Sequence, residues 1–320
     1  MVPDRTVSRR ALSAPRNLGD ALFQGWAWLM AAIVAVLIIL LAYELFAGAR
    51  QGLSRFGLPF LVDATWDPVF EEFGALPAIY GTLVSSLLAL AVAGPLGLLS
   101  AIFLAELAPG WLDRPLSFLI ELLASIPSVV YGLWGLYVLI PVLRNPVETG
   151  LRSRLGLLPL FSCTPLGLGM LAAVAILAIM ILPYATAVAR DVLRAVPDDQ
   201  REAMLALGAT RWETIWQVVV PYARSGIVGG LMLALGRAVG ETMAVTMVIG
   251  NRPDISACLF NPAYTLASQI ANEFTEATTD IHVSVLIELG LVLFVITLIL
   301  NALAQLLVWR MNGGARRRRV

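Results

Sequence analysis

Long apolar stretches separated by short polar segments dominate the chain. The stretch WAWLMAAIVAVLIILLAY, residues 26–43, runs for 18 residues without a charge, which is long enough for a candidate membrane helix. Comparable segments lie at about 26–48, 77–105, 117–142, 166–189, 222–250 and 283–309. At 1.5 Å per residue, each can cross a hydrocarbon core of ~30 Å. The pattern predicts an all-α integral membrane protein with six transmembrane helices.

Proline and glycine interrupt several of these segments. Three segments contain a helix-breaking residue: Pro95, Pro127 and Pro183. In a bundle, neighbours, hydroxyls or water can satisfy the backbone groups that these prolines free. Small residues also recur at four-residue spacing in the fifth segment, where they form two pairs: Gly226 with Gly230, and Gly236 with Gly240. Because this spacing lets helix backbones approach closely, the fifth segment is predicted to pack inside the bundle.

The composition supports a membrane protein and narrows its chemistry. Hydrophobic residues make up 59% and charged residues 14% of the 320 positions, against about half and about a quarter in soluble chains. All 22 basic residues are Arg, so the chain has no Lys for an ATP-binding P-loop or for a Schiff base. We therefore expect a protein that is not an enzyme and holds no cofactor, with any ATP hydrolysis carried out by another chain.

Histidine and cysteine are too scarce to indicate a reactive centre. His282 is the only histidine, so neither a His-based metal site nor a Ser-His-Asp triad is expected, and we read it as a single imidazole at a loop edge. Cys163 and Cys258 fall in loops predicted to lie outside. An oxidising compartment would allow a disulfide between them, but two unpaired thiols are the favoured interpretation.

The distribution of arginines predicts the orientation of the chain. With the N-terminus inside, 15 arginines fall in inner segments, 6 fall in outer segments, and Arg237 lies within a span. This excess predicts that both termini are cytoplasmic. The first apolar run is too long for a signal peptide and lacks a small-residue cleavage site. The predicted organisation is a cytoplasmic tail at 1–25, a transmembrane domain at 26–310 and a basic tail at 311–320.

A long inner loop, residues 190–226, joins the fourth and fifth segments. Pro197, Asp198 and Asp199 are typical of a helix start, and Gly208 permits a turn or a close backbone approach. Two short helices on either side of Gly208 would form a compact knob at the inner surface. The knob is either a solvated connector or a docking element for a soluble partner.

The sequence of this loop resembles the EAA loop of ABC-importer permeases. In EAMLALGATRWETIWQVVVP, four residues match that pattern in register: Glu202, Ala203, Gly208 and Pro221. Met204 replaces the second Ala, and Val218 and Val220 replace Ile and Leu. In that family the loop sits in a cleft of the ATPase subunit and transmits its closure to the membrane helices. The resemblance implies a coupling loop at about 196–221 in a MetI-like permease bundle.

Further stretches narrow the resemblance. ELLASIPSVVYGLWGL, GRAVGETMAVTMVIGN, ANEF and IELGLVLFVIT resemble the PstC-type permease of phosphate importers over about residues 75–310. MAVTMVIGN after Gly-Glu-Thr favours the PstC type over the related PstA type. The resemblance implies a permease subunit for inorganic phosphate. Its implied partners are a PstA-type permease subunit, a PstB-type ATPase dimer that holds ATP and Mg²⁺, and a PstS-type periplasmic phosphate-binding protein.

Two opposite charges, Arg237 and Glu241, interrupt the fifth apolar segment. Arg237 lies 11 residues past Gly226, which is ~16 Å along a helix and thus near mid-membrane. The two charges are either a buried ion pair that fixes packing or part of the substrate path. The path is favoured, because intramembrane charges are by default functional and a guanidinium fits phosphate oxygens. The family resemblance also places both residues there.

Other polar side chains in the spans give weaker signals. Thr242 could add a hydroxyl to the path. Ser128 and Tyr131, next to the proline of the third segment, either line the path or satisfy backbone groups freed by that proline. Glu121 and Glu288 are expected near span ends, where either could reach an interface.

Three other functions stay open at this point. The chain could belong to a permease for another oxyanion, such as sulfate or molybdate, which uptake assays would separate. It could be a proton-coupled secondary carrier, which would transport without a partner. It could be a membrane assembly protein without transport, but that function gives no reason for an arginine within a span.

Overall fold

Helices form most of the structure. The computed structural model describes residues 18–316, and within that range six helical spans are long and apolar enough to cross a membrane. Their bounds are Gly19–Gly48, Leu76–Leu107, Ser128–Leu155, Met170–Arg194, Arg211–Val239 and Asp280–Met311. The prediction of an all-α membrane protein with six spans is confirmed. The predicted tails at 1–25 and 311–320 lie partly outside the described residues.

The chain divides into two compact units. The first ends at Ala47 and contains nearly all of helix α1 (Leu18–Gly48). Large apolar side chains of α1 are exposed, among them Leu37, Ile39 and Leu40, as expected of a helix that crosses lipid. The second unit begins at Gly48 and holds the other five spans.

The centre of the second unit is a bundle of α3 (Leu76–Ile102), α8 (Met170–Arg194) and α11 (Val220–Val239). Helix α14 (Asp280–Arg316) also packs on α11. Glycines allow the close approach: Gly230 faces Val188, and a Cβ on Gly230 would lie 2.6 Å from Val188 Cγ1. Gly226 faces Val192 in the same way, so the predicted close packing of this glycine pair is confirmed.

Only one of the three prolines within the predicted spans interrupts its helix. Helix α3 continues through Pro95 and α8 continues through Pro183, because the rest of a membrane bundle can accommodate an internal proline. At Pro127 the helix does end. Ile126 before it is extended, with ψ 131°, which is the conformation that a following proline favours.

The break at Pro127 moves the third span along the chain. Helix α4 (Gly110–Ser125) precedes it as a separate helix. The span itself consists of α5 (Ser128–Trp134), α6 (Ile140–Val142) and α7 (Thr149–Leu155), joined by the π-helical turns Gly135–Leu139 and Leu143–Glu148. The predicted third span at 117–142 was therefore wrong, because the apolar residues of α4 were read as part of it.

The fifth span also differs from its prediction at 222–250. It is built from α10 (Arg211–Thr214), the π-helical turn Ile215–Val219 and α11. Helix α11 ends at Val239, and a short helix α12 (Met243–Val248) follows after a break. The residues between these two helices are Gly240, Glu241 and Thr242.

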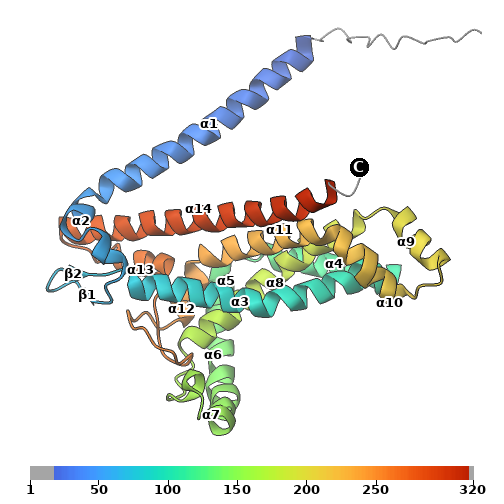
Figure 1. Ribbon diagram of the computed structural model, residues 1–320. Helices are drawn as coiled ribbons and strands as arrows, with labels where there is room; N and C mark the ends of the chain where they lie inside the picture. Colours follow the sequence, from blue (N-terminus) through green and yellow to red (C-terminus); the bar gives the residue numbers. More distant parts are fainter. Residues whose placement is uncertain (1–17, 317–320) are drawn as a thin grey trace, which may run out of the picture. The chain divides into compact units, whose positions relative to one another are not determined.

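The second unit carries different structures at its two ends (Figure 1). One end, called the hairpin end here, holds α2 (Arg50–Arg55), the 3-10 turn Leu58–Leu61 and α13 (Leu266–Glu273). It also holds the antiparallel strands β1 (Trp66–Asp67) and β2 (Glu72–Phe73). The other end, called the α9 end, holds α9 (Asp198–Ala206) and α10, with the π-helical turn Phe103–Leu107 after α3.

The two cysteines are joined. Cys163, after the 3-10 turn Pro159–Phe161, forms a disulfide with Cys258 in the loop before α13. The backbone N–H of Leu259 donates to the Leu160 carbonyl at 3.0 Å, which holds the two loops side by side. The prediction of unpaired thiols was wrong, since 95 residues separate the cysteines and no sequence pattern shows that their loops meet.

Candidate functional site

The packing of α11 on α8 sets the depth of Arg237. Gly226 faces Val192 and Gly230 faces Val188, so the two helices run antiparallel. Continuing this register by seven residues places Arg237 level with Ile181, near the middle of α8. Ala238 and Ile181 belong to the same buried cluster. Arg237, although it lies in the last turn of α11, is therefore level with the middle of the neighbouring span α8.

Arg237 has no ion-pair partner within the described residues, and its side chain is exposed. A lone arginine facing lipid at this depth would cost at least ~2.5–3.5 kcal/mol on insertion scales. The exposed face of α11 around Arg237 is therefore not a lipid surface. It must meet water, an anion or another protein.

Glu241 does not pair with Arg237. Helix α11 ends between them, so the i,i+4 geometry of a continuous helix is lost. Instead, Glu241 Oε1 accepts a hydrogen bond from the backbone N–H of Ala244 at 3.2 Å, in the first turn of α12. The interpretation of the two charges as a buried ion pair is contradicted. A Cβ on Gly236 or Gly240 would meet no atom of another segment of the described chain, so the close packing expected of this glycine pair is not made within the described residues.

The break in the third span lies beside the break in the fifth. Helix α5 packs on α12, and a Cβ on Gly132 would lie 2.6 Å from Met247 Sδ and 3.1 Å from Ala244 Cα. Tyr131, which precedes Gly132, is buried. Two interrupted helices thus meet at the depth of Arg237. Interrupted helices at mid-membrane commonly form the substrate sites of transporters.

Three hydroxyl side chains lie at these breaks. The Tyr131 hydroxyl donates to the Leu123 carbonyl at 2.8 Å, so it satisfies one of the last carbonyls of α4. The Thr242 hydroxyl donates to the Gly240 carbonyl at 3.3 Å. Ser128 is partly exposed at the start of α5. Two of the three hydroxyls therefore donate to backbone carbonyls at the helix breaks. All three lie on the segments next to Arg237 and Glu241.

A second candidate surface occupies the α9 end. Glu202 and Ala203 on α9, and Pro221 at the start of α11, are exposed. Gly208 has φ +87°, a left-handed conformation that glycine adopts freely, and a Cβ there would meet nothing within 4 Å. Leu207 is 83% exposed. The loop is open and partly apolar, which suits a docking element better than a solvated connector.

The start of α10 is fixed by a capping box. The Thr210 hydroxyl accepts from the Glu213 backbone N–H at 3.2 Å, and Glu213 Oε2 accepts from the Thr210 backbone N–H at 2.7 Å. Such a reciprocal pair satisfies two helix-end donors. The turn after Gly208 is therefore held in one conformation.

Ion pairs that the sequence does not reveal fasten the α9 end. Arg190 near the end of α8 pairs with Glu121 of α4 at 3.0 Å, and Arg194 pairs with Asp113 of α4. Arg201 of α9 pairs with Glu106 at 2.7 Å. Glu121 was predicted near a span end, and it reaches Arg190 from a helix outside the span. Residues so far apart in sequence leave no spacing pattern to identify them.

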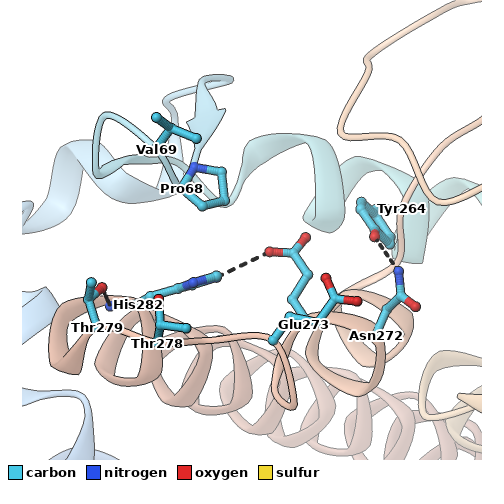
Figure 2. Close-up of a pocket in the computed structure, with 9 residues that line it drawn as sticks. Pro68, Val69, Tyr264, Asn272, Glu273, Thr278, Thr279 and His282 are labelled. Atoms are coloured by element: carbon cyan, nitrogen blue, oxygen red, sulfur yellow. Dashed lines mark hydrogen bonds and ion pairs between the residues drawn. The ribbon is translucent and has the colours of Figure 1, made fainter.

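A polar pocket of about 460 Å³ lies at the hairpin end, between β1–β2, α13 and α14 (Figure 2). His282 is 7% exposed, and its Nε2 lies 3.3 Å from Glu273 Oε2. The Trp66 indole N–H donates to the same oxygen at 2.8 Å. The prediction that His282 is a simple loop-edge imidazole was wrong. It helps to fasten the hairpin to α13 and α14.

Two other pocket residues pair with each other. The Asn272 amide donates to the Tyr264 hydroxyl at 2.8 Å (Figure 2). Burial raises the pKa of Tyr264 above its ordinary value, so the hydroxyl keeps its proton at neutral pH.

Glu288 lies inside α14 and does not reach an interface, contrary to its predicted position. Its side chain is buried, and its Oε2 has no hydrogen-bond partner within the described residues. A Cβ on Gly52 of α2 would collide with this carboxyl group. Glu288 is thus enclosed between α14 and α2, away from the interrupted helices.

Comparisons with known proteins agree on a family. A family model described as "Binding-protein-dependent transport system inner membrane component" matches residues 93–313. The phosphate transport system permease protein PstC of Mesorhizobium japonicum is 49% identical over 314 residues, which cover 97% of this chain and 94% of that protein. The PstC protein of Haemophilus influenzae is 45% identical over 297 residues, covering 92% and 94%. A PstC 2 protein of Mycobacterium tuberculosis is 37% identical over 309 residues, covering 93% and 95%.

Solved structures share the fold. A chain of the MetNI methionine ABC transporter superposes with a TM-score of 0.53 at 20% identity, covering 73% of this chain and 94% of that one. A chain of a bacterial alginate ABC transporter superposes with a TM-score of 0.58 at 17% identity, covering 92% and 94%. These likenesses support a MetI-like permease bundle.

Proposed function

The chain belongs to the PstC family of binding-protein-dependent ABC-importer permeases, and we propose that it forms one side of the path by which inorganic phosphate crosses the inner membrane. It is a multi-pass membrane component of an ABC importer. The PstC relatives are named for phosphate transport, and the chemistry of the interrupted helices suits that anion.

The observation that carries the proposal is the exposed, unpaired Arg237 at mid-span. A guanidinium presents a planar fork of donors that matches phosphate oxygens. Because Arg237 forms no ion pair in the described chain, no internal carboxylate competes for the anion. Glu241 lies one break away, and an ionised carboxylate can only accept hydrogen bonds. Phosphate near neutral pH keeps at least one proton, so its P–OH group can donate a hydrogen bond to Glu241.

The open face around Arg237 supports a second permease subunit as partner. Gly236 and Gly240 contact nothing else in the described chain, and Arg237 between them is exposed. A helix of another subunit could approach these glycines closely and enclose the arginine between the two subunits. We assign this place to a PstA-type permease, so that the two chains form the path together.

The α9 end supports an ATPase partner. The matched residues Glu202, Ala203, Gly208 and Pro221 surround an open, ordered turn, which suits insertion into the cleft of a PstB-type ATPase dimer. In this arrangement ATP and Mg²⁺ are held by the ATPase, and this chain hydrolyses nothing. The α9 end and both termini are then cytoplasmic, and the hairpin end faces a PstS-type binding protein in the periplasm.

The test of the substrate is uptake by the whole importer in proteoliposomes. Labelled phosphate should accumulate when ATP and the binding protein are present, and labelled sulfate or molybdate should not. If sulfate or molybdate accumulates and phosphate does not, the chain is a permease for another oxyanion. If this chain alone transports phosphate without ATPase or ATP, it is a secondary carrier.

A further inference from the structure

Helix α4 has an acidic face directed at the basic end of α8. Asp113, Ser117 and Glu121 lie four residues apart in α4, so they share one side of the helix. Arg194 pairs with Asp113, and Arg190 pairs with Glu121 at 3.0 Å. The Ser117 hydroxyl donates to Asp113 Oδ1 at 3.0 Å. The face of α4 is thereby seated on the last two turns of α8.

The same end of α8 is fastened to the coupling loop. Arg201 of α9 donates to the Leu193 carbonyl at 3.0 Å and pairs with Glu106 at 2.7 Å. The side chains of Arg201 and Glu106 are only 17% and 11% exposed. The hydrogen bond to Glu106 raises the pKa of Arg201, so its guanidinium stays charged. The coupling loop, the end of α8 and α4 are therefore linked by one set of charged contacts.

The other end of α4 reaches the path. Helix α4 ends at Ser125, just before the break at Pro127, and α5 begins at Ser128. The Tyr131 hydroxyl donates to the Leu123 carbonyl at 2.8 Å, so the last turn of α4 and the first turn of α5 are joined. A displacement of α4 would carry Tyr131 with it, where α5 packs on α12.

Stability alone does not account for the pair between Arg190 and Glu121. The Glu121 side chain is 60% exposed, and exposed ion pairs contribute about 0–1 kcal/mol. Arg190, whose side chain is only 7% exposed, has a second partner in Asp191 at 2.8 Å. Its charge would stay paired without Glu121. The contact with Glu121 thus serves to attach α4 to α8, beside the pair of Arg194 with Asp113.

We propose that Glu121 is a positioning residue for transport, whose ion pair with Arg190 makes α4 follow the movement of the coupling loop. Closure of the ATPase moves α9 and the end of α8, and α4 transmits this movement to Tyr131 on the path side of the break. This inference rests on the proposed function. It adds a route by which the ATPase changes the path.

The first measurement is the ratio of phosphate transported to ATP hydrolysed by the whole importer in proteoliposomes. In Glu121→Gln, the ATPase rate should stay within about twofold of the wild type, while phosphate moved per ATP falls at least fivefold. Arg190→Gln should lower the ratio by a similar factor. The double variant should be no worse than either single one, because all three lack the same contact. The control is Asp191→Asn, which removes the ion pair of 2.8 Å between Arg190 and Asp191 but leaves the contact with α4, and it should leave the ratio unchanged.

The second measurement does not depend on the substrate. A bimane fluorophore on Val130→Cys, an exposed position in α5, reports the path side of the break. Trapping the ATPase with ATP and vanadate should shift its emission in the wild-type importer, and Glu121→Gln should abolish the shift. The inference is overturned if Glu121→Gln leaves the ratio of phosphate to ATP unchanged. It is also overturned if the emission shift is absent from the wild type or survives in Glu121→Gln. A failure of the proposed function differs, because phosphate uptake is then absent from the wild type while the emission shift persists.

Discussion

At Arg237, the number of helical residues that separate it from Gly226 could be read from the sequence, but the surroundings of its side chain could not. Its depth follows from its distance to Gly226, since α11 is a continuous helix between them. The same count places Glu241 beside Arg237, one helical turn further on, only if the helix continues. The helix stops at Val239, and Glu241 binds a backbone N–H of α12 instead. Gly240 with Thr242, inside an apolar run, is the signal that could have indicated a break.

Glu241 is predicted to discriminate between oxyanions by their protons. Ionised Glu241 can accept a hydrogen bond from a phosphate O–H but repels sulfate, which carries no proton, and such like-charge contacts cost several kcal/mol. Glu241→Gln should therefore slow phosphate movement and allow a measurable sulfate leak. The assay follows both labelled anions in vesicles that hold a binding-protein-independent assembly, because the binding protein would otherwise select the anion first. Loss of phosphate transport without a sulfate leak would refute this role.

At the scale of elements, hydropathy identified the number of spans but misplaced two of them. Helix α4 is apolar along one part of its surface. Hydropathy averaged over a window of residues therefore cannot distinguish α4 from the start of the third span. The position of Pro127 could not decide the matter, since Pro95 and Pro183 lie inside unbroken helices. The two short helices on either side of Gly208 were predicted correctly, because helix-start residues and a glycine turn are local signals. The ion pairs of α4 with α8 join distant residues and could not be predicted.

The close contact of α11 with α8 is tested by two neighbouring glycines. A Cβ on Gly230 would crowd Val188, whereas a Cβ on Gly229 would meet nothing within 4 Å. Gly230→Ala should destabilise the purified chain by about 1–3 kcal/mol, the usual cost of overpacking. Gly229→Ala should be neutral or slightly stabilising, because alanine favours the helix by about 1 kcal/mol over glycine. Thermal unfolding in detergent compares the two; equal effects would show that the helices are not packed as described.

The turn of the coupling loop is tested at Gly208. Gly208→Arg should abolish uptake while the chain stays in the membrane, because a large side chain at the turn would block docking to the ATPase. Gly208→Ala separates the effect of backbone strain from the effect of blocked docking. An alanine in the left-handed conformation costs about 1–2 kcal/mol, but its methyl group meets no atom of this chain within 4 Å. It should retain more uptake than Gly208→Arg. Normal uptake and normal ATPase association in Gly208→Arg would make the loop a mere connector.

At the scale of the molecule, the surfaces that this chain leaves open indicate that it is one part of an assembly. The arginine at mid-span and the coupling loop at the α9 end each lack a partner in the described residues. The isolated chain should therefore bind and hydrolyse no ATP, because it has no lysine for a P-loop. Nucleotide binding and phosphate release are measured on purification fractions. ATPase activity that follows this subunit at a constant ratio would contradict that prediction.

The central claim is that phosphate passes Arg237, and the most direct measurement is the initial rate of labelled phosphate uptake by importers that carry Arg237→Gln. Loss of a charged hydrogen-bond donor costs about 1.5–3 kcal/mol, so the rate should fall about 10- to 100-fold while the complex stays assembled. Arg224→Gln on the same helix, where Arg224 is exposed and donates to the Met311 carbonyl, is the matched control and should transport normally. Uptake by Arg237→Gln at the wild-type rate would contradict the account.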